Sequence, residues 1–182
     1  MKAKEATDIL ISLGWSAFKD EVGDRYTKYF LPDRVVQIIY GIEKIRENQK
    51  FGSTLTLTTV EFSRACSEIH DKPGDTPLIS AWKGIDIRAP EILEQHIHQA
   101  SNQAVEWARA QDLRKALHDH AALPTDAPGA RPLLHLAALA ILGDVERLNL
   151  YRSSFEAGNK LGFVNYITKE YIDRALEVAI RK

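Results

Sequence analysis

The 182-residue sequence has little of several features that would point to particular functions. It has one cysteine, Cys66, so no disulfide can form within the chain. Its 24 Lys and Arg residues almost balance 25 Asp and Glu residues, for a formal net charge of -1. Residues 1–90 carry 13 basic and 13 acidic side chains, so neither half has the basic bias of a nucleic-acid-binding protein. The composition therefore predicts no nucleic-acid partner.

Long apolar runs are also missing. The longest, Leu133–Leu142, is interrupted by His135 and is too short to span a bilayer. The first residues, MKAKEATDILISLGW, lack the apolar core of a signal peptide. With 45% hydrophobic and 27% charged residues, the chain can still bury a core. We expect a folded cytoplasmic protein without a membrane segment.

Motifs of enzymatic chemistry are absent. The sequence contains no GxSxG, glycine-rich phosphate loop, HExxH or paired CxxC. Cys66 falls on an expected helix between Ala65 and Ser67, which favours a buried, inert thiol over a nucleophile. We therefore expect a non-enzymatic protein without a cofactor. An enzyme with a dispersed site is the alternative, and its residues would come from Glu61, His70, Asp86, His118 and Asp119.

Two histidine pairs, His96 with His98 and His118 with His120, suggest a metal site at first sight. Both pairs fall in segments with helical spacing. Residues two apart on an α-helix point about 200° apart, so neither pair can chelate an ion from one face. The spacing predicts solvent-facing or helix-terminal histidines and no metal site.

What the sequence does contain is a change of pattern near Pro90. Before it, residues 3–13 have helical spacing, and the segments 24–31, 34–43 and 53–59 alternate as strands do. After it, apolar residues recur every three to four positions. The pattern predicts an α+β fold. We expect an N-terminal helix and an antiparallel β-meander in 1–89, a helical half in 90–182 packed against it, and a proline-containing linker near 124–132.

Local signals predict some boundaries more closely. Thr58 followed by Glu61 has the form of a capping box, which predicts a helix from Val60 that packs on the sheet. Residues 78–88 are predicted to form a single strand at the sheet edge. Pro90 is placed in the first turn of the next helix, where its missing N–H costs nothing.

The segment 161–168 is the most distinctive short stretch. As a recognition loop it would present Phe163 and Tyr166 to a partner, because aromatic residues supply large contact areas. As a hydrophobic anchor for the last helix it would bury Leu161, Phe163 and Ile167, which alternate along the chain. Both interpretations remain open at this stage.

The strands supply further candidate contacts. Strands alternate their faces, so a sheet covered by helices on one side leaves aromatic residues of the other side available. Acidic neighbours would steer a basic partner. The competing explanation is that these aromatics complete a core on both sides. The candidates are the aromatics Tyr26, Tyr29, Tyr40 and Trp82 and the acidic residues Asp20, Glu21, Asp24 and Asp33.

The chain's size and α+β pattern resemble bacterial toxin-immunity proteins, which are compact and cytosolic. That resemblance implies neutralisation of a cognate toxin by direct binding. Many such proteins that block basic nucleases are acidic, whereas this chain is nearly neutral. The N-terminal helix ending at Leu13-Gly14-Trp15, followed by strands and a helix, also partly resembles type III secretion chaperones. In that alternative the protein partner would be a secreted effector.

Overall fold

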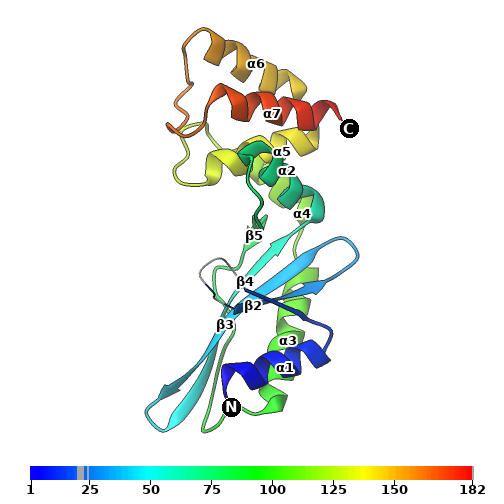
Figure 1. Cartoon of the computed structure of the whole chain (residues 1–182), viewed down its shortest axis with the longest axis vertical. Coiled ribbons are helices and arrows are strands. Elements are labelled where there is room, and N and C mark those ends of the chain that lie inside the picture. Colours follow the sequence, from blue (N-terminus) through cyan, green and yellow to red (C-terminus); the bar gives the residue numbers. More distant parts are fainter. Residues whose placement is uncertain (20–22, 24, 182) are drawn as a thin grey trace. The chain divides into compact units, whose positions relative to one another are not determined.

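The structure, a computed structural model, describes residues 1–19, 23 and 25–181. The chain forms two compact units, whose elements are drawn in Figure 1. One, here called the sheet unit, consists of Met1–Thr58 and Ile79–Gln111. The other, the helical unit, consists of Thr59–Leu78 and Asp112–Lys182. Each unit is therefore assembled from two separate stretches of the chain.

In the described part of the sheet unit, six strands form one antiparallel sheet. The order is β1-β2-β3-β4-β5, and β6 also pairs with β4. This arrangement confirms the predicted meander and the α+β class. The strands are β1 (Ser16–Lys19), β2 (Arg25–Phe30), β3 (Val35–Ile45), β4 (Asn48–Thr58), β5 (Ile79–Ser80) and β6 (Asp86–Ala89).

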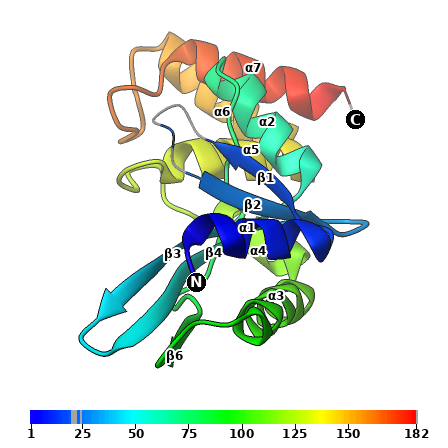
Figure 2. The same cartoon turned by 60° about the horizontal axis from the view of Figure 1, so that its bottom comes forward.

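Helices α1 (Ala3–Ser12) and α3 (Glu94–Arg109) lie side by side against one face of this sheet (Figure 2). The indole N–H of Trp15, which follows α1, donates a buried hydrogen bond to Ser101 Oγ on α3 at 2.8 Å. Between the helices and the sheet, Ile38 and Phe51 are fully buried. The predicted N-terminal helix is therefore part of the core of the sheet unit.

The predicted strand over 78–88 is wrong, because β5 and β6 are separated by a loop. Ser53 N donates to the carbonyl of Ile85 at 2.9 Å, which brings the loop against β4. A Cβ on Gly84 would lie 1.5 Å from the Ser53 carbonyl oxygen. Only glycine allows this close approach of two backbones, so Gly84 was the sequence signal for the interruption.

The predicted start of α2 at Val60 is confirmed, but its capping residue and the predicted start of α3 are corrected. The cap of α2 (Val60–His70) is Thr59, whose Oγ1 accepts a hydrogen bond from Phe62 N at 3.0 Å. Thr58 is instead the last residue of β4. Helix α3 begins at Glu94, so Pro90 lies outside its first turn.

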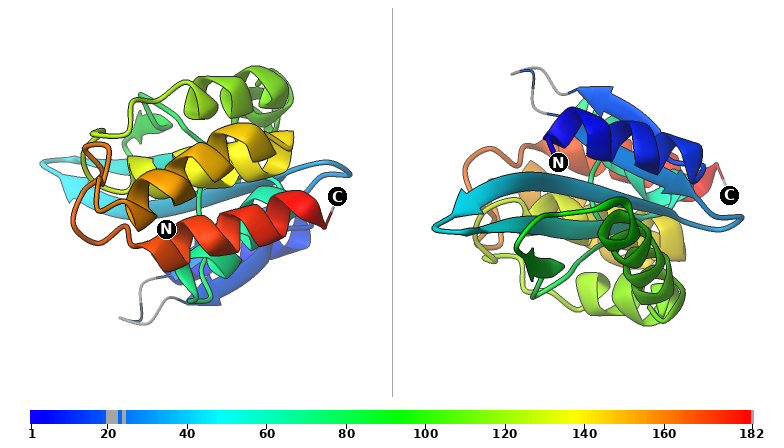
Figure 3. Two further views of the ribbon diagram at one scale, coloured as in Figure 1. Left: turned by 90° about the horizontal axis from the view of Figure 1, so that it is seen from above. Right: turned by 90° about the horizontal axis from the view of Figure 1, so that it is seen from below.

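The helical unit is built around α5 (Arg131–Leu142), nine of whose 12 residues are buried. Helix α5 contacts each of the other four helices, as Figure 3 helps to show. No described helix is both long and apolar enough to cross a membrane. The other four are α2, α4 (Leu113–Ala121), α6 (Val145–Glu156) and α7 (Lys169–Ile180).

The units do not follow the expected division into 1–89 and 90–182. Helix α2, which precedes Pro90, packs against α5 and α7, whereas α3, which follows it, packs against α1 and β3. An apolar helical stripe predicts that a helix is covered but not which surface covers it. Of the linker expected near 124–132, residues 124–130 lie between α4 and α5 within the helical unit, and Arg131 and Pro132 are the first residues of α5.

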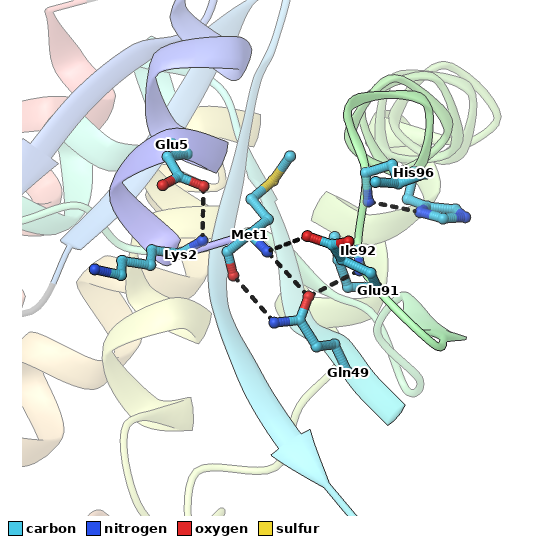
Figure 4. Close-up of polar contacts among 8 residues, drawn as sticks. Met1, Lys2, Glu5, Gln49, Glu91, Ile92 and His96 are labelled. Atoms are coloured by element: carbon cyan, nitrogen blue, oxygen red, sulfur yellow. Dashed lines mark hydrogen bonds and ion pairs between the residues drawn. The ribbon is translucent and has the colours of Figure 1, made fainter. Parts of the chain in front are cut away.

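Gln49 on β4 joins three segments of the sheet unit (Figure 4). Its Oε1 accepts hydrogen bonds from the α-amino group of Met1 at 3.1 Å and from Ile92 N at 2.8 Å. The Met1 amino group also lies 3.6 Å from a carboxylate oxygen of Glu91. Gln49 therefore connects β4 to the start of α1 and to the segment that leads into α3.

We expect Gln49→Ala to lower the free energy of unfolding of the sheet unit by about 1–3 kcal/mol, because the N–H of the buried Ile92 loses its acceptor. The exposed control Gln103→Ala should change it by less than about 0.5 kcal/mol. Urea unfolding followed by tryptophan fluorescence tests this, since Trp15, Trp82 and Trp107 all lie in the sheet unit. Equal losses in both variants would contradict it.

Candidate protein-binding surface

The sheet face opposite α1 and α3 carries a group of exposed apolar side chains; we call it the open face. The register places Phe18, Tyr26 and Ile39 in one row across three neighbouring strands. Of these, Ile39 is 44% exposed, and Phe30 on the same face is 57% exposed. The open face includes Phe18, Tyr26, Lys28, Phe30, Ile39 and Thr54.

The aromatic part of the open face is ordered by its own contacts. The rings of Phe18 and Tyr26 stack with centroids 5.5 Å apart. The ammonium of Lys28 lies 4.9 Å from the Phe18 centroid and 5.5 Å from that of Tyr26. Rings held in one place lose little conformational freedom on binding, which suits them to an interface. Of the predicted aromatic anchors, Tyr26 lies on this face.

Trp82 is fully exposed in the loop between β5 and β6. The loop is held to β4 on both sides, because Ala81 N donates to Leu55 O and Ser53 N donates to Ile85 O, each at 2.9 Å. The structure therefore places Trp82 at the β4 edge of the sheet, on the side away from β1. Tryptophan is enriched among the residues that dominate interface energies, so Trp82 is a second candidate contact.

Tyr29 and Tyr40 lie on the face of the sheet that the helices cover. The Tyr40 hydroxyl lies 2.7 Å from Thr7 Oγ1 of α1, and its ring stacks on the buried Phe51. Burial raises the pKa of Tyr40. The Tyr29 ring lies 5.3 Å from that of Trp15. For these two residues the structure supports the core explanation, because alternation within β2 and the register with β3 place both of them on the face opposite Tyr26.

The acidic candidates divide into two groups. Asp20, Glu21 and Asp24 lie outside the described residues. Asp33 is exposed but pairs with Arg34 at 2.7 Å, and the hydrogen bond from this guanidinium holds the pKa of the Asp33 carboxyl below its usual value. Arg34 also donates to two backbone carbonyls near the end of α3. Asp33 is therefore already matched by a neighbouring charge.

The segment 161–168 acts mainly as an anchor. Phe163 is 4% exposed, and its ring meets that of Tyr151 edge-on at 5.3 Å. Ile167 is fully buried. Tyr166 keeps 42% of its surface exposed, while its hydroxyl donates to Gly129 O at 2.8 Å. Phe163 is thus inaccessible to a partner, and Tyr166 retains one accessible side.

The residues named for a dispersed active site have other neighbours. Asp86 pairs with Lys50 at 3.1 Å, Asp119 pairs with Lys115 at 2.6 Å, and the His70 ring lies 5.9 Å from the Tyr171 ring. Within residues 1–19, 23 and 25–181, no three His, Cys, Asp or Glu side chains gather as metal ligands would. Glu61 lies in the first turn of α2, and His118 is exposed on α4.

Three of the four paired histidines have identifiable local contacts. His96 Nδ1 accepts the hydrogen bond from Leu93 N at 2.9 Å and so caps α3. His98 lies 3.4 Å from Glu94, one helical turn earlier. The His120 ring lies 2.8 Å from Leu78 O. His96 lies in the first turn of α3, His118 and His120 lie in the last turn of α4, and His98 is exposed, so the expected solvent-facing or helix-terminal positions are correct.

Cys66 is 1% exposed on α2. Burial raises the pKa of its thiol to about 12, with a smaller opposite effect from the Thr76 side chain. The thiolate, not the thiol, is the nucleophilic form. A protonated, buried Cys66 fits the inert role expected for it.

The buried titratable group that sequence reasoning missed is His135 on α5, at 1% exposure. Its Nδ1 lies 3.1 Å from His120 O, and its Nε2 lies 3.0 Å from the Tyr151 hydroxyl. A carbonyl only accepts, so Nδ1 carries the proton and Nε2 accepts from Tyr151. Burial lowers the pKa of His135. Arg147 acts in the same direction, whereas Asp144 and the carbonyl of His120 oppose it.

This site predicts a pH-dependent stability. The unfolded chain takes up a proton at His135 near pH 6.5, the ordinary histidine pKa, and the folded chain does so only at lower pH. The free energy of unfolding should therefore fall as the pH drops below about 6.5. The free energy of unfolding is compared at about pH 7.5 and about pH 5.5. The part of its pH dependence that comes from His135 should be lost in His135→Gln and kept in the exposed control His118→Gln. Urea unfolding followed by circular dichroism decides, and equal pH dependence in wild type and His135→Gln would contradict the assignment.

Comparison with known proteins gives one assignment. No curated protein sequence and no solved structure matches the chain. The profile of a family of unknown function (DUF6990) matches residues 2–180, and the chain therefore belongs to that family.

Proposed function

We propose that this chain is a non-catalytic protein-binding protein that uses the open face of its sheet. The observation that carries the proposal is the row Phe18, Tyr26 and Ile39, which crosses three strands while keeping apolar surface accessible. Exposed apolar groups that lie together mark interaction sites more often than isolated ones do. Aromatic residues in particular dominate the energies of protein interfaces.

The chemistry-bearing residues support a non-catalytic role through the positions they occupy. The Cys66 thiol is buried and protonated, and His135 is held between a backbone carbonyl and Tyr151. His96 caps a helix. These groups stabilise the fold, whereas the open face exposes the apolar side chains of Phe18, Phe30 and Ile39.

The narrower proposal is toxin immunity, in which the partner is a cognate toxin held by direct contact. Secretion chaperoning, with an effector as the partner, is the alternative. Asp33 was expected to attract a basic partner, but its charge is already paired with Arg34. We therefore attribute most of the binding energy to apolar contact. The identity of the bound protein separates the two roles.

The test compares proteins retained by the wild-type chain with those retained by Phe18→Thr and Ile39→Thr in cells that express it. Threonine is β-branched and favours strands, so both variants should keep their strands. Leu150→Ser is the control, because Leu150 is 64% exposed on α6 of the helical unit. We expect one protein to be retained by wild type and Leu150→Ser and lost from both strand variants.

Once purified, that protein should bind the strand variants at least about tenfold more weakly, which corresponds to about 1.4 kcal/mol for an interface anchor. Isothermal titration calorimetry measures the affinities, and thermal unfolding checks that all variants are folded. Affinities equal to wild type in folded Phe18→Thr and Ile39→Thr would remove the open face from the interface.

A further inference from the structure

Two glycines lie directly opposite each other on the open face. The register pairs Gly41 of β3 with Gly52 of β4. Neither has a positive φ, and a Cβ on Gly41 would meet no atom within 4 Å. Glycine weakens a strand interior, and neither backbone conformation nor a close backbone contact requires it at Gly41. The consequence of the pair is a patch of bare backbone in the middle of the sheet.

This patch is the floor of a shallow, open hollow. On one side stands the cross-strand pair of Ile39 and Thr54, and on the other stands the pair of Glu43 and Lys50. Ile39 also ends the apolar row that includes Phe18 and Tyr26. The hollow is therefore continuous with the proposed binding surface and has one apolar wall and one charged wall.

Lys50 leans over the floor of the hollow. A Cβ on Gly52 would lie 3.3 Å from Lys50 Cε and 3.7 Å from its Nζ. The same ammonium pairs with Asp86 at 3.1 Å, so its charge is already compensated. A side chain that binds here therefore needs no carboxylate to neutralise Lys50. It binds more tightly if its own surface attracts a cation.

We infer that the hollow receives one aromatic side chain, a tyrosine or tryptophan of the protein partner, lying flat on Gly41 and against the Lys50 side chain that leans over Gly52. The inference rests on the proposed function and names the chemistry of its partner. Aromatic side chains cover bare glycine in sheets, and a ring face attracts an ammonium. The open face already contains this pairing, since the Lys28 ammonium lies over the Phe18 and Tyr26 rings.

The probe is N-acetyl-tryptophan amide, titrated into the ¹⁵N-labelled full chain while amide shifts are recorded. We expect saturable shifts centred on the amides of Gly41 and Gly52. N-acetyl-leucine amide should bind about two- to fivefold more weakly, the factor that an exposed cation–π contact supports. Lys50→Met, which keeps the apolar stem, should remove this preference. Shifts that are absent, or spread over the surface, would overturn the inference.

Gly41→Thr is the decisive variant, because its side chain enters open space and threonine favours strands. It should unfold at the same or a higher temperature than wild type and lose the probe-induced shifts. The control Gln37→Thr lies on the same strand and face but outside the hollow, and it should keep them. Retained shifts in Gly41→Thr would show that the ring binds elsewhere.

The partner obtained with the open-face variants separates this inference from the proposed function. Weaker binding to both Phe18→Thr and Gly41→Thr supports the proposed function and the inference about the hollow. Weaker binding to Phe18→Thr alone keeps the proposed function and rejects the hollow. Undiminished binding to Phe18→Thr and to Gly41→Thr rejects the proposed function and the inference about the hollow. Self-association in sedimentation that Gly41→Thr prevents would make a second copy of the chain the occupant and overturn the assignment to another protein.

Discussion

The pairing of β3 with β4 is the constraint on which the sheet unit depends. The two strands pair over eleven residues each, and the register decides the face of every side chain between them. Ile38 and Leu55 are paired and buried, whereas Ile39 and Thr54, one step along, are paired and exposed. A slip of one residue would exchange these sets. The same register therefore builds the core and the open face, and neither can change without the other.

The chain passes back and forth between the two units, so each unit needs two separate stretches of the sequence. The chain leaves the sheet unit after Thr58, returns after Leu78, and leaves again after Gln111. A cut at Pro90 would separate Trp15 from Ser101, its buried hydrogen-bond partner on α3. It would also divide the helical unit, because α2 would remain with the strands while the helices that it packs against would be removed. One boundary in the sequence thus cannot isolate either unit.

Several polar side chains of this protein serve to hold its segments together. His96 caps a helix, and His135 bridges a carbonyl and a tyrosine within the helical unit. Gln49 joins three segments of the sheet unit. The open face instead presents the stacked rings of Phe18 and Tyr26, the exposed side chain of Ile39 and two paired glycines. A surface of this kind contributes shape and apolar area, which are the main contributions of an interface centre.

The amino-acid pattern by itself determined the α+β class and the meander, because alternation over 24–31 and 34–43 and helical spacing elsewhere are local properties. Only the tertiary structure decided which face the helices cover. Alternation separates Tyr26 from Tyr29 within β2, but it does not say which of the two faces is buried, and only the register with β3 places Tyr40 on the face of Tyr29. The Gly41 and Gly52 pair likewise required the register, since eleven positions separate the two glycines in the sequence. Packing partners and cross-strand neighbours are non-local, and therefore a pattern read along one segment does not contain them.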